Sequence, residues 1–353
     1  MLIRFFFCQL VLLFLGFHLV CAYEPNTRIT VRGDRFEING TAVHLYGIRV
    51  ASASQSDKLT EALVANLDEY NAHGVNAVTV FLQGSSGGFS DPFSEDGNHI
   101  DPDHLGRIKH IIEACDQRGM IVIVGIFYQR VMKNLNDTRR IQDTSGVRNA
   151  VDTTTRMLRG YSNVIVNIAN EQNSAFYKDI EFFDFRNPER IIELCERVRR
   201  NDPDRLVGAG GYDDEANIII GKSPMVDVLL FDTFHQDIIN NQDSGWHYDL
   251  FVKRGVVDKP IVNVELFGGW TSRCVTESGV GGCFLPEHKR LYFQEIDAAR
   301  KRPGLSVFFH ASSWCQGQTE MQPIRYDLGG YGTAEDVGIR WWFEYVRSTI
   351  WDR

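Results

Sequence analysis

Two glutamates, Glu171 and Glu265, follow apolar segments that are typical of buried strands. Glu171 comes after residues 164–169 and Asn170, and Glu265 comes directly after residues 261–264. The 94 residues from one glutamate to the other equal about three strand-and-helix units of roughly 30 residues each. In an eight-stranded α/β barrel, this spacing puts the glutamates at the ends of strands 4 and 7, on the face that carries active sites. Two carboxyl groups that face each other across a cleft are suited to hydrolysis of a glycosidic bond.

The order of the elements predicts a (β/α)8 barrel with an N-terminal β-hairpin over residues 28–38, turning at Gly33-Asp34. Several expected strands are continuous apolar runs, which is typical of strands covered on both faces. An open doubly wound sheet is the alternative, but no GxGxxG motif follows an early strand. Helices are expected at residues 57–72, 103–118 and 335–350, and barrel strands at 43–48, 75–81, 120–126, 164–169, 206–209, 226–231, 261–264 and 305–309.

Side-chain alternation along a strand predicts which residues point into the barrel. It puts Asn263 and Glu265 on one face of strand 7, and Asn167, Ala169 and Glu171 on one face of strand 4. The inward face is the one that opens into the barrel mouth. A single strand-end glutamate could equally form a structural ion pair, but two at matching strand ends favour a catalytic pair.

The segments that carry the two glutamates resemble clan A retaining glycoside hydrolases, in particular the cellulase- and mannanase-like barrels of glycoside hydrolase family 5. The resemblance covers most of the chain after residue 22. It implies that Glu171 is the general acid/base, that Glu265 is the nucleophile, and that Asn170 binds the 2-hydroxyl of the sugar. The segments are ING…LYGI, HGVNAVTVF, RGMIVIVGI, VNIANEQN and PIVNVELFGG.

The chain departs from the family 5 pattern at strands 2, 6 and 8. Strand 2 lacks the usual arginine, so Arg49 after strand 1 or Arg130 after strand 3 is expected to supply that charge. The His-x-Tyr of strand 6 is missing, and His235 is the one histidine there. At the end of strand 8, His310 stands where the family has a tryptophan, and Trp314 follows four residues later.

Further residues are expected to line the substrate cleft because they follow barrel strands. Trp270 and Trp314 could each stack on a sugar face, and His235 and His310 could orient a carboxylate or bind a hydroxyl. Tyr128 follows strand 3 together with Gln129. For the histidines, a purely structural role is the alternative.

Residues 1–22 have the pattern of a secretion signal. Arg4 provides a short positive start, residues 5–20 are apolar almost throughout, and residues 20–22 fit a cleavage site. The apolar run is short for a membrane span and no basic cluster follows it, which favours cleavage over an anchor. We therefore expect a secreted or periplasmic protein without stable membrane insertion, whose single catalytic domain covers residues 23–353.

The net charge of the chain limits the classes of molecule that it is expected to bind. The chain has 37 Lys and Arg residues against 46 Asp and Glu residues, a net charge of −9, which becomes −10 when Arg4 leaves with the signal. An acidic excess argues against a nucleic-acid partner. A carbohydrate substrate and no cofactor are expected, and the sequence does not indicate an oligomeric state.

Five cysteines lie after residue 22: Cys115, Cys195, Cys274, Cys283 and Cys315. Cys274 and Cys283 are close together in a loop rich in Gly, Ser and Thr, where a disulfide would brace the segment after Glu265. Cys115 and Cys195 sit in helical patterns and are expected to be buried thiols. No CxxC pair or tight Cys/His cluster occurs, so no metal site is predicted.

Two other classes of function compete with a glycosidase. A barrel that binds glycans without cleaving them would fit the missing family residues, although it would not need Asn170, Glu171 and Glu265 together. A metal-dependent hydrolase would call for His-x-His, which the sequence lacks. An esterase would call for a GxSxG elbow between a strand and a helix, whereas the GxSxG match at residues 84–88 lies in the long polar loop after strand 2.

Overall fold

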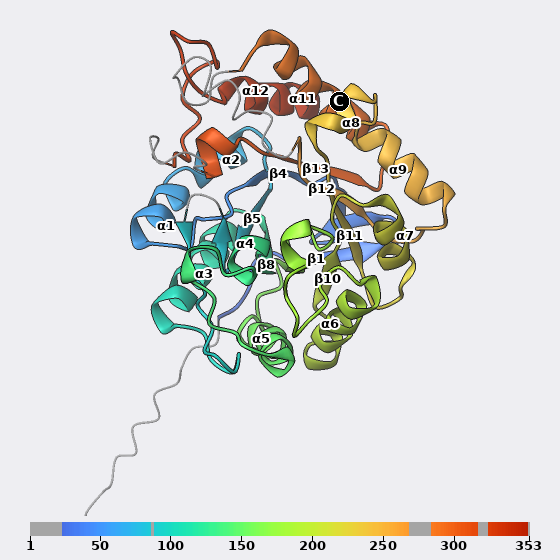
Figure 1. The fold of residues 1–353 in the computed structure, drawn as a ribbon. Helices are drawn as coiled ribbons and strands as arrows, with labels where there is room; N and C mark the ends of the chain where they lie inside the picture. The colour runs from blue at the N-terminus through green and yellow to red at the C-terminus, as the bar shows by residue number, and fades with distance from the viewer. Residues whose placement is uncertain (1–22, 86–87, 268–283, 317–323, 352–353) are drawn as a thin grey trace, which may run out of the picture.

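Eight parallel strands close into a barrel in the computed structural model, which describes residues 23–85, 88–267, 284–316 and 324–351 (Figure 1). The last barrel strand pairs with the first, so the sheet has no edge. The (β/α)8 barrel is therefore confirmed, and the open sheet is not what forms. In order around the barrel the strands are β4 (Tyr46–Arg49), β5 (Ala77–Phe81), β8 (Ile121–Phe127), β9 (Val164–Ala169), β10 (Leu206–Ala209), β11 (Val228–Asp232), β12 (Ile261–Glu265) and β13 (Leu305–Phe309).

Helices surround the barrel, and several of their N-termini are capped by acidic or hydroxyl side chains, such as Asp143 at α5 and Ser56 at α1. The single helix expected at 57–72 is in fact two, because the Asn66 amide bonds to the Ala62 carbonyl and competes with the helical ladder. None of the helices in the described ranges is long and apolar enough to cross a membrane. The helices are α1 (Asp57–Val64), α2 (Leu67–Ala72), α3 (Pro102–Asp116), α4 (Gln129–Met132), α5 (Thr144–Met157), α6 (Pro188–Asn201), α7 (Asp214–Lys222), α8 (His235–Ile239), α9 (Ser244–Lys253), α11 (Pro286–Arg300) and α12 (Arg340–Trp351).

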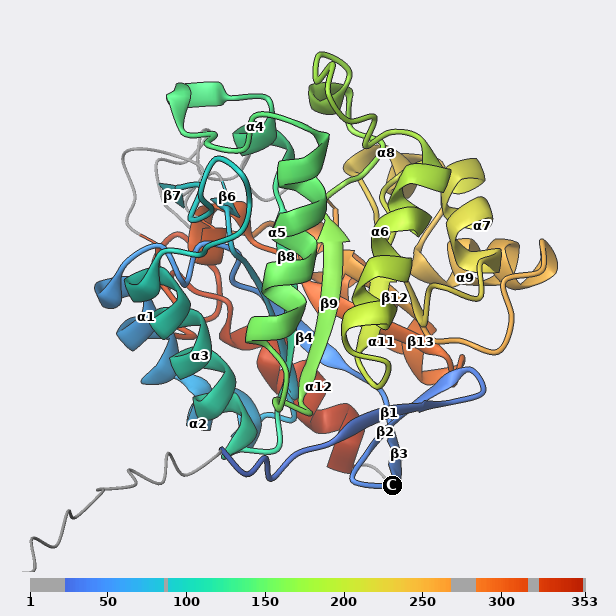
Figure 2. The same cartoon turned by 90° about the horizontal axis from the view of Figure 1, so that it is seen from below.

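A small antiparallel sheet closes the end of the barrel at which the strands begin. Its strands are β1 (Ile29–Arg32), β2 (Arg35–Ile38) and β3 (Thr41–Val43). The expected hairpin thus has a third strand, because the Asn39-Gly40 turn, with positive φ at both residues, returns the chain once more before β4 begins. Figure 2 shows β1–β3 at one end of the barrel, with α4 and the short hairpin of β6 (Gly84–Ser85) and β7 (Gly88–Phe89) at the other.

The barrel interior is filled by the inward side chains of alternate strand positions. One glycine shapes this interior next to the candidate site. A side chain on Gly125 of β8 would meet the Phe81 ring of β5 at 2.0 Å. Phe81 in turn lies under the guanidinium of Arg49, 5.1 Å from ring centroid to carbon. Gly125 therefore makes room for the ring that supports Arg49. The buried inward residues include Ala77, Ile121, Ile123, Ile165, Val228, Leu230, Val262, Val264 and Phe308.

The close contact over Gly125 makes a testable prediction. Gly125→Ala should destabilise the fold by about 1–3 kcal/mol, because the added methyl forces the Phe81 ring out of its place. Thermal or urea unfolding would measure this loss. Gly106→Ala is the control, since Gly106 lies in α3 with open space around it and should tolerate alanine without loss. Equal stability of the two variants would contradict the account.

Candidate active site

Both glutamates lie where the strand ends predicted them. Glu265 is the last residue of β12 and is 5% exposed. Glu171 follows β9 by two residues and is partly exposed. Its backbone has a φ of +44°, in the left-handed region that non-glycine residues rarely adopt. Such strain is concentrated at functional sites, because the surrounding structure must hold it in place.

A β-bulge, and not plain alternation, turns Glu265 into the barrel mouth. Phe231 of β11 pairs with Asn263, but the next residue, Asp232, pairs with Glu265, so Val264 is the extra residue in β12. The prediction that Asn263 shares the inward face with Glu265 is therefore wrong. Alternation fails here because the bulge shifts the period by one residue.

The two glutamates are joined by an ion pair followed by a chain of hydrogen bonds. Arg49 Nη2 lies 3.1 Å from Glu265 Oε2 and donates to Asn170 Oδ1 at 2.9 Å. Asn170 Nδ2 donates to Gln129 Oε1 at 2.9 Å, and Gln129 Nε2 donates to Glu171 Oε2 at 2.7 Å. This chain connects β4, β9 and the segment after β8. The structure thus brings together Arg49, Asn170, Glu171 and Glu265 as predicted, with Gln129 as the link.

Arg49, and not Arg130, is the cation against Glu265. Its side chain is fully buried, and its Nε also donates to Gln316 Oε1 at 3.3 Å. Arg130 lies over the Phe176 ring at 5.6 Å and acts electrostatically on Glu171. The charge that the resemblance expects from strand 2 therefore comes from strand 1.

His310 completes the surroundings of Glu265 from β13. Its Nε2 lies 3.6 Å from Glu265 Oε1. Burial lowers the pKa of His310 to about 4, so the imidazole is neutral at neutral pH despite the nearby carboxylate. Tyr128, also expected at the cleft, is buried against Phe81, and burial raises its pKa to about 12.

The two glutamates have different electrostatic surroundings. Burial is the largest cause that raises the pKa of Glu171 well above its usual range, followed by the negative charges of Glu265 and Asp232. A raised pKa favours the protonated form of Glu171, which a proton donor requires. Glu265 is the one that Arg49 compensates. The pair therefore divides into a carboxyl group whose raised pKa favours the protonated form and a carboxyl group held against a cation.

Trp314 is not where a sugar platform needs it. The ring is 1% exposed, its Nε1 donates to the Asp327 carbonyl at 2.7 Å, and Arg325 covers one face at 4.3 Å. The expectation that Trp314 lines the cleft and stacks on a sugar face is therefore wrong, because the ring is buried in the core. Trp270 and the Cys274–Cys283 disulfide lie outside the described residues, and His235 begins α8.

Two residues of the site were not predicted: Asp232 and Gln316. Asp232 ends β11, and it follows an apolar run just as Glu265 does, so the same signal could have found it. Gln316 approaches Arg49 from 267 positions away, in the π-helical turn Ser312–Gln316, and no local pattern marks it.

A second network of buried hydrogen bonds fixes the bulge from the side of β12 that faces α9 and α11. The Asn263 amide donates to Ser244 Oγ and to Thr233 Oγ1, both at 2.8 Å, and its oxygen accepts from the backbone N–H of Glu265 at 3.1 Å. Ser244 N–H donates to Glu295 Oε2 of α11 at 3.0 Å. Helices α9 and α11 thus fix the backbone of Glu265.

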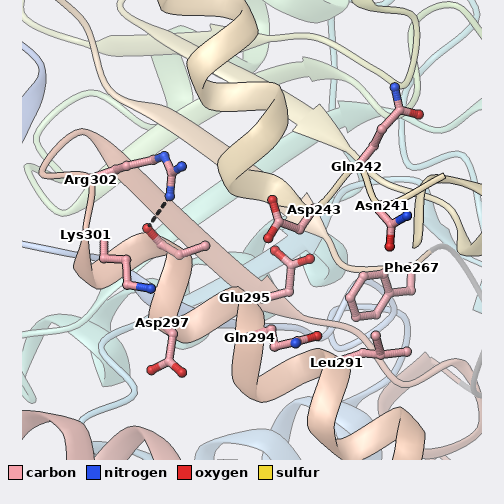
Figure 3. A pocket seen from close by; sticks show the side chains of 11 residues that line it. Asn241, Gln242, Asp243, Phe267, Leu291, Gln294, Glu295, Asp297, Lys301 and Arg302 are labelled. Carbon is pink, nitrogen blue, oxygen red and sulfur yellow. Dashed lines mark hydrogen bonds between the residues drawn. The ribbon is translucent and has the colours of Figure 1, made fainter. Parts of the chain in front are cut away.

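Glu295 also forms part of a separate cavity of about 530 Å³ between the start of α9 and α11 (Figure 3). Figure 3 shows its carboxyl group beside that of Asp243. Burial raises the pKa of Glu295 to about 8, and Asp243 adds to the rise. The cavity contains neither Glu171 nor Glu265. It is lined by Asn241, Gln242, Asp243, Phe267, Leu291, Gln294, Glu295, Asp297, Ala298, Lys301 and Arg302.

The raised pKa of Glu295 makes stability depend on pH. The folded protein keeps this proton up to about pH 8, whereas the unfolded chain loses it near 4.5. Stability from the neutral group is therefore fully present below about pH 4.5 and is lost as the pH rises through 8. Glu295→Gln should remove this loss, because the amide is neutral throughout. Urea unfolding from pH 4 to 9 would measure the difference, and parallel pH profiles for the two proteins would contradict the prediction.

We compared the sequence and the fold with those of known proteins. No model of a protein family matches the sequence, and no curated protein matches it. Solved structures do match: β-mannanase from the blue mussel Mytilus edulis has a TM-score of 0.53 and 16% identity over 87% of this chain and 99% of that one. The β-glucanase SdGluc5_26A from Saccharophagus degradans, in complex with cellotetraose, has a TM-score of 0.58 and 12% identity over 93% of this chain and 95% of that one.

A glycoside hydrolase family 5 protein from Bacteroides vulgatus matches with a TM-score of 0.57 and 13% identity over 81% of this chain. The chain spans 64% of the length of that protein. The protein is therefore structurally similar to family 5 and other glycoside hydrolases, as the sequence resemblance predicted. At these identities, the likeness establishes the fold.

Proposed function

We propose that the protein is a secreted retaining glycoside hydrolase that cleaves O-glycosidic bonds of a poly- or oligosaccharide. The observation that carries the proposal is the placement of the two glutamates at strand ends in the barrel mouth, where burial raises the pKa of Glu171 and Glu265 is held against buried Arg49. A retaining glycosidase needs this combination of a proton donor and an ionised nucleophile. Retention itself is taken from the resemblance to clan A, and secretion from the pattern of residues 1–22.

In the proposed first step, Glu265 attacks the anomeric carbon while Glu171 gives its proton to the departing glycosidic oxygen. A glycosyl ester forms on Glu265 and the alcohol leaves. In the second step, Glu171, now ionised, takes a proton from water as the water attacks the anomeric carbon, and Glu265 is released. Asn170 binds the sugar 2-hydroxyl.

Arg49 and Gln129 prepare the two carboxyl groups for these roles. Arg49 pairs with Glu265 in a buried setting, and its own position is fixed by Asn170 and Gln316. Gln129 aims the carboxyl group of Glu171 through a 2.7 Å hydrogen bond. The similar structures support a carbohydrate partner, since the Saccharophagus degradans β-glucanase holds cellotetraose.

The two-carboxylate assignment predicts that Glu171→Gln and Glu265→Gln each lower turnover by about 10²–10⁴-fold or more without loss of fold. A screen of β-linked polysaccharides for reducing sugar, with circular dichroism of each variant, measures both. Glu196→Gln, at an exposed position on α6, is the matched control and should leave activity unchanged. Near-normal turnover in either active-site variant would refute the assignment. Glycan binding without any cleavage by the wild type would favour the binding barrel instead.

The hydrogen bond from Gln129 predicts a change in the pH profile. Donation from Gln129 favours the ionised form of Glu171, so Gln129→Ala should raise the pKa of Glu171 further. Activity that needs the protonated acid would then persist to higher pH. We expect the alkaline limb of kcat/KM to move up by about 0.5–1 pH unit, since one hydrogen bond is worth ~1 kcal/mol. Gln142→Ala, at an exposed glutamine, is the control; a downward shift in Gln129→Ala would contradict the proposal.

A further inference from the structure

A third carboxyl group, that of Asp232, lies in the barrel mouth beside Glu265. Asp232 is the last residue of β11 and is the Cα partner of Glu265 on β12. It shares the inward face of its strand with Val228 and Leu230. The residue is 4% exposed, and its Oδ1 accepts no hydrogen bond within the described part of the chain. A buried acceptor without a donor is costly, so it indicates a place for a group that binds there.

The charges around Asp232 leave it poorly compensated. Burial raises its pKa well above the usual range, and the adjacent charge of Glu265 adds to the rise. Arg49 acts in the opposite direction, but Arg49 is shared with Glu265. His310 is neutral at neutral pH, as its pKa of about 4 requires. The mouth therefore holds three carboxyl groups around one buried guanidinium.

A carboxyl group differs from an amide in what it can bind. A neutral sugar hydroxyl could be bound as well by an asparagine, which would cost less to bury next to Glu265. The advantage of a carboxylate is a charge-assisted hydrogen bond to a cation. No group of three or more His, Cys, Asp or Glu among the described residues is arranged to hold a metal ion. The geometry thus favours a cation carried by the substrate.

The charge of the whole chain acts in the same direction. A net charge of −9 repels glycans that carry acidic sugars and attracts those that carry amines. The long-range field and the local acceptor therefore select for the same kind of substrate.

We propose that Asp232 is a specificity-determining residue that binds a free amino group on the sugar held against Glu265, so that the substrate is a glycan containing amino sugars. This inference rests on the proposed glycosidase function and names its substrate class. On binding, the proton of the Asp232 carboxyl group would pass to the neutral amine of the sugar, and the resulting ammonium group would pair with the Asp232 carboxylate.

The test compares two matched substrates, β-1,4-linked tetrasaccharides of glucosamine and of glucose, in the wild type and in Asp232→Asn. The wild type should have the higher kcat/KM on the glucosamine oligomer. Asp232→Asn should lower the ratio of the two kcat/KM values roughly 10- to 100-fold, the effect expected for losing a hydrogen bond to a charged group. Asp204→Asn, at an exposed aspartate, is the control and should leave this ratio unchanged.

Binding of both oligomers to the Glu171→Gln variant, measured by calorimetry with and without Asp232→Asn, gives a readout without turnover and should show the same change in preference. The proposal is overturned if the wild type does not favour the glucosamine oligomer, or if Asp232→Asn leaves the ratio unchanged. Cleavage of neutral glycans that depends on Glu171 and Glu265, without any preference for amines, would retain the glycosidase and reject the role of Asp232. Absence of cleavage of any glycan would reject the glycosidase itself.

Discussion

The ion pair between Arg49 and Glu265 is the constraint on which the rest of the site depends. Both side chains are almost completely buried, and removal of one partner from such a pair typically costs about 3–5 kcal/mol, because the other charge is left uncompensated. The fold therefore holds Arg49 on several sides. Phe81 lies beneath the guanidinium, in the space that Gly125 leaves, while Asn170 and Gln316 accept its hydrogen bonds. From Asn170 the same contacts run on to Glu171.

The position of Glu265 depends equally on elements outside the barrel. Asn263 holds the bulge at Val264 in place. Its side chain binds the backbone N–H of Glu265 and Ser244 at the start of α9. Glu295 of α11 continues this contact. Stability and catalysis are thus linked in the proposed enzyme: the buried carboxyl group that makes folding sensitive to pH also supports the strand that carries the nucleophile.

Much of this arrangement is readable from the sequence, because buried parallel strands are continuous apolar runs. Strands β9, β10 and β13 have the predicted ends, and both glutamates follow from where such runs stop. The bulge was not readable, since Val264 suits either face of a strand. Trp314 was predicted to line the cleft because it follows strand 8. Its burial depends on a hydrogen bond to the Asp327 carbonyl, 13 residues later, which no local sequence pattern indicates. Arg49 was one of two candidates, and only the closed barrel shows which of them reaches Glu265.

Trapping of the glycosyl ester tests the central claim most directly. A 2-deoxy-2-fluoro glycoside of the sugar found by the substrate screen slows breakdown of the intermediate, so that the labelled peptide can be identified by mass spectrometry. The account predicts one sugar per chain on the peptide that contains Glu265, and no label in Glu265→Gln. Label on another residue, or cleavage with inversion of the anomeric carbon and no label, would contradict the assignment of Glu265 as the nucleophile held by Arg49.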